Sequence, residues 1–414
     1  MPNATRVDRN FRRKLNIERP MKFDPTTFQL TELKTVKMRS LVTGVIGLAL
    51  LLVGYFVKTE QFFYSYLVAY LFWISIALGA FFLVLLFHLT GTVWGVVMRR
   101  ILETMMKVLP LMALFFIPIL LGIHHVYHHW AHVDIAADPI LSKKAGYLNI
   151  PFFAIRSAVY FLIWYLIANK LYKTSVAMDS GATEAHLKTL KKVSAPGMIL
   201  FALTTTFASF DWIMTLYPHW YSTIFGLYFF SGGLVGALVF MIYFGLYLGK
   251  RGVLDKIITV EHYHDLAKFT FGFIIFWGYM GFSQYMLIWY ANIPEETIFY
   301  LERWQGTWSI ITMILVFGHF LIPFMGLLSR NSKRNFTYIK YMALFILLMH
   351  WIDLYWLVMP VLHKSGVKFC GLDLLAMIGI GGFFMWFIWM QLGKNAITPF
   401  GDPKFEESVK HHIL

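Results

Sequence analysis

The sequence predicts an all-α protein that crosses a membrane ten times. Three observations predict this fold class. The composition is that of a chain embedded in lipid, because 58% of the residues are hydrophobic and only 14% are charged. Ten segments are apolar over about 20 residues, which is the length that a spanning helix needs. Two of these segments also share one polar pattern, which indicates an internal duplication.

The ten segments are separated by polar stretches. We expect helices at about 41–57, 66–90, 97–122, 150–171, 195–217, 222–249, 265–290, 304–328, 337–359 and 369–392. They divide the chain into a basic cytoplasmic N-terminal tail (1–40), a transmembrane domain (41–393) and a cytoplasmic C-terminal tail (394–414). The first segment begins too far from Met1 for a secretory signal, so we expect no cleavage.

The distribution of lysine and arginine predicts that both termini lie in the cytoplasm. With the N-terminus inside, most of the 36 basic residues fall in cytoplasmic segments, as the positive-inside rule describes. The net charge of +14 follows from this asymmetry, and no motif of a nucleic-acid-binding domain accompanies it. We therefore expect a lipid membrane and no nucleic acid as partner. The basic residues expected on the other side are Lys58, Lys143, Lys144, Arg156, Arg303, Lys364 and Lys368.

The chain contains a single cysteine, Cys370. One thiol cannot form a disulfide within the chain, ligate an iron–sulfur cluster through several thiolates or supply a C-x-x-C-H haem attachment. If electrons move near this protein, we expect another polypeptide to carry them.

Asp211 lies inside an apolar segment, in the stretch FASFDWIMTLYPHW. It precedes Pro218 by seven residues, which places it about 10 Å below the outer end of the fifth helix. A charged side chain near the centre of a spanning helix costs about 2.5–3.5 kcal/mol on insertion scales. We therefore expect Asp211 to face the protein interior, either protonated or with a partner. Considered alone, such a residue is better explained by helix packing than by a function.

Asp353 repeats this pattern in the ninth helix. In both segments a basic pair is followed by eighteen residues, an aspartate, six residues and a proline. The two aspartates are then four helices apart, an even number that preserves the direction of the helix. We expect two parallel four-helix bundles, formed by helices 2–5 and helices 6–9, with helices 1 and 10 flanking them.

Other polar side chains cluster near Asp353. His350 precedes it by three residues and shares its helical face, while Ser309, Thr312 and His319 share one face of the eighth helix. These groups predict a proton path, because carboxyl, imidazole and hydroxyl groups can pass protons in a low dielectric. Ligation of a b-type haem by two histidines is less favoured, since the first bundle lacks an equivalent pair, and plain packing is the third alternative. The proton-path candidates are Asp211, Asp353, His350, His319, Ser309 and Thr312.

Five histidines lie in the stretch GIHHVYHHWAHVD, at the outer end of the third helix. If the helix continues, His125, His129 and His132 share one face, at a spacing compatible with Zn or Cu. No glutamate accompanies them as the motif H-E-x-x-H would require. Proton exit or quinol contact, and packing against a partner, are the alternatives to metal binding. The candidates are His124, His125, His128, His129 and His132, and we predict no catalytic residue.

Three stretches resemble one protein family. SFDWIMTLYPHWYSTIFGLYFFSGG, FWGYMGFSQYMLIWYANIPEETIFY and DLYWLVMP are similar to the F subunit of bacterial alternative complex III, a quinol:electron acceptor oxidoreductase. The resemblance covers essentially helices 2 to 10. Members of that family look like the membrane subunits of polysulfide reductase, with ten helices in two four-helix bundles. The resemblance thus implies the same architecture as the duplication.

The resemblance also implies a location and partners. It implies the bacterial cytoplasmic (inner) membrane and a complex with multihaem and monohaem cytochrome c subunits, an iron–sulfur subunit and a sister ten-helix subunit. Haem and iron–sulfur clusters would belong to these partners, and a soluble cytochrome or a terminal oxidase would accept the electrons. In that family the better supported quinol site lies in the sister subunit. The F subunit is thought to contribute proton translocation or structure, with quinol or menaquinol contact left open.

We therefore predict a cofactor-free, non-redox membrane subunit of a quinol-oxidising respiratory complex. A stand-alone secondary transporter is one alternative, and a purely structural scaffold is another. Transporters usually contain discontinuous helices and often inverted repeats, whereas the repeats expected here are parallel and the helices continuous.

Overall fold

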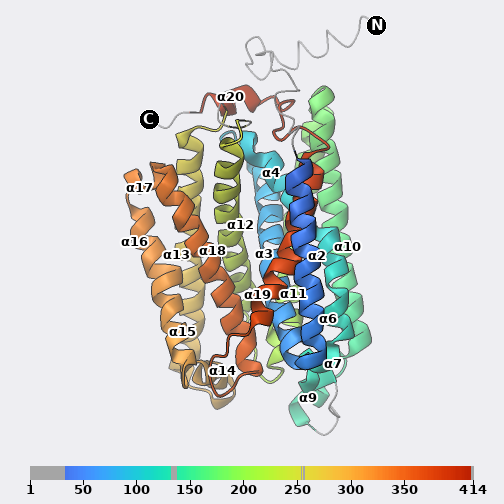
Figure 1. The fold of residues 1–414 in the computed structure, drawn as a ribbon, viewed down its shortest axis with the longest axis vertical. Helices are drawn as coiled ribbons and strands as arrows, with labels where there is room; N and C mark the ends of the chain where they lie inside the picture. Colours follow the sequence, from blue (N-terminus) through green and yellow to red (C-terminus); the bar gives the residue numbers. More distant parts are fainter. Residues whose placement is uncertain (1–32, 132–137, 253, 255–256, 412–414) are drawn as a thin grey trace, which may run out of the picture.

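The computed structural model describes residues 33–131, 138–252, 254 and 257–411, and these ranges contain helices but no strand. Ten stretches are long and apolar enough to cross a membrane, which confirms the predicted number (Figure 1). The chain is therefore a multi-pass membrane protein. The spans are Lys34–Val57, Thr59–Thr90, Val96–Leu121, Ile150–Ser180, Glu184–Leu216, Phe225–Gly249, Val260–Ala291, Trp308–Leu328, Phe336–Val361 and Gly371–Leu392.

Most spans consist of one long α-helix, and some are extended by a short 3-10 turn. The long helices are α2 (Lys34–Val57), α3 (Thr59–Thr90), α10 (Ile150–Ala177), α11 (Glu184–Trp212), α12 (Phe225–Gly249), α13 (Val260–Ala291), α18 (Phe336–Val358) and α19 (Gly371–Leu392). The 3-10 turns are η3 (Met178–Ser180), η4 (Met214–Leu216) and η6 (Met359–Val361).

Several helices begin earlier than their apolar stretches. The helix α11 begins at Glu184 rather than near residue 195, because Thr183 caps it by accepting a hydrogen bond from the backbone N–H of His186. In the same way α2 begins at Lys34 rather than near residue 41. Hydropathy detects only the part of a helix that is apolar enough for lipid. It therefore does not detect polar turns that continue the helix beyond that part.

The third span is not the continuous helix that we predicted. It consists of α4 (Val96–Met106), α5 (Leu109–Phe115) and α6 (Ile117–Leu121). Pro110 and Pro118 lie in the first turns of α5 and α6. A proline lacks the N–H that would bond to the preceding turn and its ring clashes with that turn, so each proline starts a new helix.

The eighth span contains a local change of helix type. It consists of α15 (Trp308–Ile314), the π-helical turn η5 (Leu315–Leu321) and α16 (Ile322–Leu328). Turns of π-helix are rare, and they are frequently found at functional sites. His319 lies in this turn.

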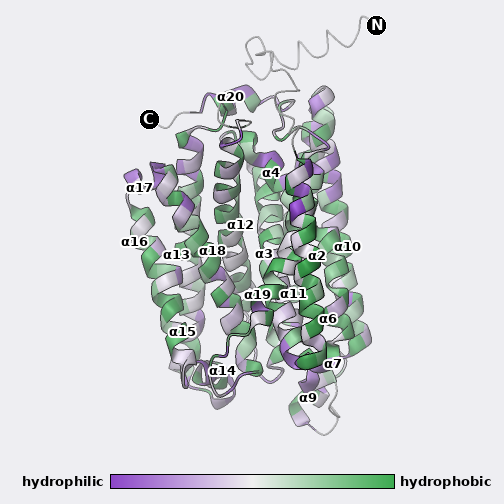
Figure 2. Ribbon diagram, in the orientation of Figure 1, coloured by the Kyte–Doolittle hydropathy of each residue, from purple (hydrophilic) through white to green (hydrophobic). Residues whose placement is uncertain are grey.

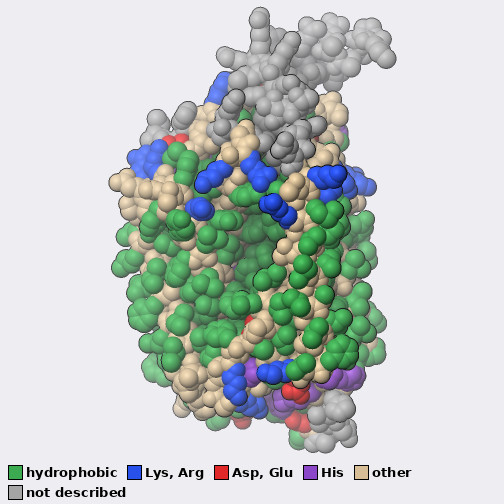
Figure 3. Space-filling view, viewed as in Figure 1, with side chains coloured by type: hydrophobic (Ala, Val, Ile, Leu, Met, Phe, Trp, Pro, Cys, Tyr) green, Lys and Arg blue, Asp and Glu red, His purple; other side chains and the backbone are tan. Residues whose placement is uncertain are grey.

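Short helices mark the two ends of the molecule. Both described chain ends lie at one end in Figure 1, which we call the terminus-bearing end. Lys and Arg side chains gather there on the face drawn in Figure 3, whereas histidines lie at the opposite end, which we call the histidine end. The short helices are α17 (Arg330–Arg334) and α20 (Phe405–Val409) at the terminus-bearing end, and α7 (Ile123–Val126), α8 (His128–Ala131), α9 (Pro139–Lys144) and α14 (Pro294–Trp304) at the histidine end.

The helices α3 and α12 form the centre of the molecule. Almost all of their residues are buried, and they lie against each other where Gly79 meets Gly233. A Cβ on Gly79 would lie 2.5 Å from the carbonyl oxygen of Gly233, so this approach requires glycine. The outer helices carry exposed apolar side chains, such as Val53 and Phe56 on α2, and much of α2 is coloured as hydrophobic in Figure 2. Such a surface is suited to contact with lipid.

Candidate functional site

Asp353 lies in the interior, on α18, with 2% of its surface exposed. Its carboxyl group accepts a short hydrogen bond from the hydroxyl of Tyr228 on α12. The indole Nε1 of Trp277 on α13 donates to the other carboxyl oxygen over 3.3 Å. None of the ion pairs between described residues includes Asp353. Its donors are therefore neutral groups from two neighbouring helices.

His350 lies one turn before Asp353 and points toward α3. Its Nε2 lies 2.9 Å from the hydroxyl oxygen of Ser75, and its buried Nδ1 has no hydrogen-bond partner among the described residues. The glycines of α12 leave room for this ring. A Cβ on Gly232 or Gly236 would lie 3.3 Å or 3.0 Å from atoms of His350. The glycines of the stretch GGLVG, residues 232–236, therefore leave space for the buried ring of His350 and also allow close helix packing.

His319 approaches the same place from the π-helical turn η5. Its ring lies against the indole of Trp277, with 4.0 Å between the ring centroids and a tilt of 31° between the planes, and it lies 6.3 Å from the ring of His350. The His319 side chain is fully buried, and neither of its ring nitrogens has a hydrogen-bond partner among the described residues. Trp277 thus contacts both His319 and Asp353. The structure brings these predicted residues together from two helices.

Among the described residues, Ser309 and Thr312 make no hydrogen bond to this group. The hydroxyl of Ser309 donates to the carbonyl of Gly306, in the turn that precedes its helix. The hydroxyl of Thr312 donates to the carbonyl of Arg303 and accepts a hydrogen bond from the indole of Trp356. Both hydroxyls therefore stabilise the histidine end of the eighth span.

Asp211 has a different environment from Asp353. It is fully buried on α11, and its two carboxyl oxygens accept hydrogen bonds from Nε and Nη2 of Arg156 on α10, at 2.9 Å and 2.8 Å. The hydroxyl of Tyr160 donates a third hydrogen bond over 2.8 Å. The guanidinium also lies over the ring of Tyr147, 3.7 Å from its centroid. Asp211 thus has the partner that we expected of a buried carboxylate.

Arg156 was not predicted as this partner, since we expected it only among the basic residues of the outer side. A signal was present, because Arg156 lies inside an apolar stretch on the helix that precedes Asp211. Two intramembrane residues of opposite charge on consecutive spans are expected to pair. Tyr228 and Ser75 had no comparable signal, since a tyrosine or serine inside a spanning helix is common.

The four outer histidines that the structure describes do not share one helix. The backbone leaves the helical path at Tyr127, so α7 carries His124 and His125 while α8 carries His128 and His129. The ring of His125 stacks on Phe63, with centroids 5.0 Å apart. Among the described residues no group of three or more His, Cys, Asp or Glu side chains could hold a metal ion. His132 lies outside the described residues, so a metal site that includes it stays a prediction.

The rings of His128 and His129 lie against each other, with centroids 3.8 Å apart. Burial lowers the pKa of His129 to about 4, and electrostatic interactions with His128 and Lys364 add to this effect. His129 is therefore neutral at neutral pH. This protonation state makes it a poorer proton donor near pH 7 than an ordinary histidine.

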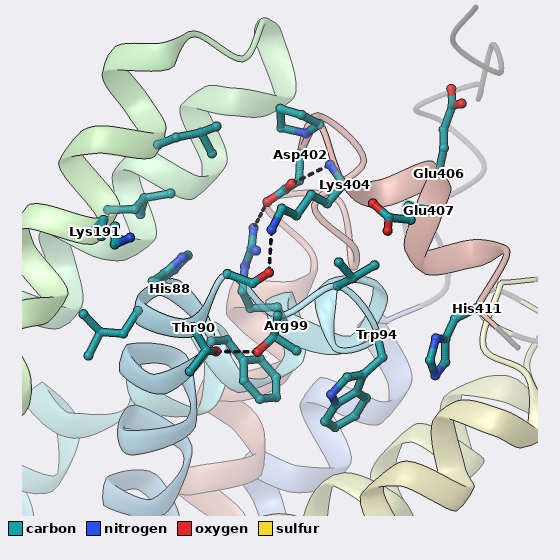
Figure 4. A pocket seen from close by; sticks show the side chains of 18 of the residues that line it. His88, Thr90, Trp94, Arg99, Lys191, Asp402, Lys404, Glu406, Glu407 and His411 are labelled. Atoms are coloured by element: carbon teal, nitrogen blue, oxygen red, sulfur yellow. Dashed lines mark hydrogen bonds and ion pairs between the residues drawn. The ribbon is translucent and has the colours of Figure 1, made fainter. Parts of the chain in front are cut away.

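A pocket of about 1210 Å³ opens at the terminus-bearing end (Figure 4). Arg99, which lines this pocket, binds Glu103 over 3.0 Å and Asp402 over 2.7 Å, and the second contact fastens the C-terminal segment to α4. The His88 side chain, 4% exposed, lies 4.0 Å from the same glutamate. Lys404 donates to the carbonyl of Gly91 and closes a second link between the C-terminal segment and the end of α3. Ionisable groups thus extend from this pocket into the protein.

The fold and these enclosed polar groups define a multi-pass membrane protein with ionisable side chains in its interior. Comparison with known proteins gives no further assignment: no protein-family model matches the chain, and no curated protein matches it.

Proposed function

We propose that this chain is a membrane subunit of bacterial alternative complex III, equivalent to its F subunit, and that it moves protons while partner subunits move electrons. The three stretches that resemble this family support the assignment, and they include Asp211, Tyr228, Trp277 and Asp353. The multi-pass fold is compatible with it. In this proposal the cytochrome c subunits, the iron–sulfur subunit and the sister subunit hold the redox cofactors.

The environment of Asp353 is the observation that carries the proton proposal. A carboxyl group surrounded by the neutral donors Tyr228 and Trp277 can gain or lose a proton without breaking an ion pair. Buried ionisable residues without a permanent partner in a spanning helix are typical of proton relays. We therefore take Asp353 as the proton carrier.

The two neighbouring imidazoles extend the proposed path. His350 contacts Ser75 on α3, while His319 lies beside Trp277, and each ring has a nitrogen without a described partner. Unpartnered buried nitrogens are rare, and ordered water commonly satisfies them. Water between His319, His350 and Asp353 would provide the hydrogen bonds along which a proton moves.

The haem alternative fits these residues less well. Ligation of a haem through Nε2 of His350 would require this nitrogen to give up its contact with Ser75. We therefore do not include a haem in the proposal.

Asp211 has a structural role in the proposal. Protonation of Asp211 would leave the guanidinium of Arg156 buried without its counter-charge, which is costly in a protein interior. The outer histidines at the histidine end remain candidates for proton exit or quinol contact, and His124 and His125 are the exposed members of that group. The cytoplasmic position of the two termini is also part of the proposal, supported by the basic residues of the terminus-bearing end.

Helix contacts support the two-bundle arrangement. In the first half α3 contacts α4 and α11, and α10 contacts α11; in the second half α12 contacts α13 and α18. The extensive contact between α3 and α12 would then join the bundles. The two aspartates lie at different distances from the ends of their helices. The helix α11 ends one residue after Asp211, whereas α18 continues beyond Asp353 to Val358.

A secondary transporter is the second candidate function, and one observation favours it. The third span is broken at two prolines, and the eighth contains a π-helical turn. Interrupted spanning helices are common where transporters bind ions. The parallel direction of the proposed repeats argues against this candidate, because many transporters contain inverted repeats.

Purification in a mild detergent distinguishes the two candidates. The full-length chain, carrying an affinity tag, is isolated from its native membrane, and the product is examined for c-type haem absorbance and for its subunits. Alternative complex III predicts haem-containing partners in fixed ratio to this chain. A pure single polypeptide without haem absorbance would contradict the proposal and favour the transporter.

A further inference from the structure

A second pocket, of about 480 Å³, lies between three helix ends at the terminus-bearing end. It is bounded by the end of α12 and the beginnings of α13 and α18. Leu246, Phe336 and Tyr341 form a largely apolar wall that is at least partly exposed. We call this the lysine-rimmed pocket, because Lys250 and Lys340 also line it.

The two lysines have no anionic partner among the described residues. Other cations near these helix ends are already engaged: Arg334 binds Glu261, and Lys333 donates to two backbone carbonyls. Lys250 is exposed, and Lys340 lies over the ring of Tyr341, 5.2 Å from its centroid. The pocket thus combines an apolar wall with two positive charges that the described side chains leave without a counter-charge.

We propose that the lysine-rimmed pocket binds an anionic phospholipid from the leaflet at the terminus-bearing end. Lys250 and Lys340 contact its phosphate, and an acyl chain lies against the wall formed by Leu246, Phe336 and Tyr341. Basic pockets between spanning helices are suited to such headgroups, and an ammonium group binds a phosphate well. The pocket lies at the end of the molecule where lysine and arginine gather in Figure 3, the side on which the positive-inside rule places anionic lipid.

The charge part of this site is tested by retention of lipid. The purified full-length protein, with any subunits that accompany it, is placed in nanodiscs of phosphatidylcholine and phosphatidylglycerol, and the retained lipid is identified by native mass spectrometry. We expect Lys250→Gln with Lys340→Gln to lower the affinity for phosphatidylglycerol by about fivefold for each lysine. The matched control is Lys170→Gln with Lys173→Gln, two exposed lysines near the same end of α10, which should leave retention unchanged.

The shape part is tested by a variant that changes no charge. Gly249 lines the pocket, and a Cβ built on it meets no atom within 4 Å, so Gly249→Leu adds apolar volume at the pocket without a clash at its Cβ. We expect it to reduce phosphatidylglycerol retention as well. Unchanged retention in either the lysine variant or the glycine variant overturns the proposal.

Added inorganic phosphate distinguishes a lipid from a free anion. The proposal predicts that phosphate does not displace phosphatidylglycerol, because the acyl chain contributes to binding. Displacement by phosphate, or equal retention of phosphatidylcholine and phosphatidylglycerol, would contradict it. This test does not depend on whether the chain belongs to a respiratory complex.

Discussion

Arg156 binds both carboxyl oxygens of Asp211, at 2.8 Å and 2.9 Å. Asp353, which occupies the matching position in the second sequence repeat, has Tyr228 and Trp277 as donors instead. The same pattern of basic pair, aspartate and proline therefore leads to two different sites. One carboxylate has a cationic partner that stabilises it, while the other is surrounded by neutral groups.

The first prediction concerns Arg156. We expect Arg156→Gln to destabilise the protein by about 3–5 kcal/mol, because it leaves the carboxylate of Asp211 buried without its counter-charge. Adding Asp211→Asn should recover much of this loss, since the double variant has no unpaired charge. Thermal unfolding of the purified protein in detergent measures both effects. Losses that simply add in the double variant would show that the two residues are not coupled.

The second prediction concerns the pH dependence around His129. Its pKa of about 4 lies below the ordinary value of about 6.5. Between these values the unfolded chain binds a proton that the folded protein does not, so the contribution of His129 to stability falls as the pH is lowered through this window. We expect the imidazole signal of His129 to titrate near pH 4 by NMR, assigned with His129→Gln. Titration near pH 6.5 would contradict the described packing.

The third prediction concerns metal binding by the outer histidines. The break at Tyr127 places His125 and His129 on separate short helices, so they lack the regular spacing that one helix would give. We expect elemental analysis of the protein, purified without added metal, to find less than one zinc or copper ion per chain. A stoichiometric metal that is lost in both His125→Ala and His129→Ala would contradict this prediction. It would support the hypothesis of a metal site in which His132 is the third ligand.

The number of spans could be predicted because a bilayer requires about 20 apolar residues in each, but the breaks could not be seen in the same way. Hydropathy is averaged over a whole span, so it detected the apolar residues around Pro110 and Pro118. It did not detect the interruption of the helix that these prolines cause. Polar turns at the ends of helices were not predicted for the same reason, as at the beginning of α11.

The candidate site was predictable only within single helices. The shared face of His350 and Asp353 follows from helical periodicity. His350 contacts Ser75, which is 275 residues away along the chain, and Asp353 contacts Tyr228, which is 125 residues away. Both contacts depend on which helices pack together. Apolar segments carry little information about that choice, because each of their faces can be buried. The difference between Asp211 and Asp353 therefore became visible only in three dimensions.

The replacement of Asp353 by asparagine tests the central proposal most directly. Asp353→Asn keeps the size of the side chain and a carbonyl oxygen for Tyr228 or Trp277, but it removes the group that binds and releases a proton. Asp211→Asn is the matched control. Both variants are assembled into the complex, reconstituted in vesicles and checked for haem content.

Proton release for each quinol oxidised is then the decisive measurement. The account predicts that the ratio falls in Asp353→Asn while haem content is preserved, and that fully assembled Asp211→Asn retains the ratio of the unmodified protein. An unchanged ratio in Asp353→Asn would contradict the proton-carrier role and leave this residue, like Asp211, with a structural role in helix packing.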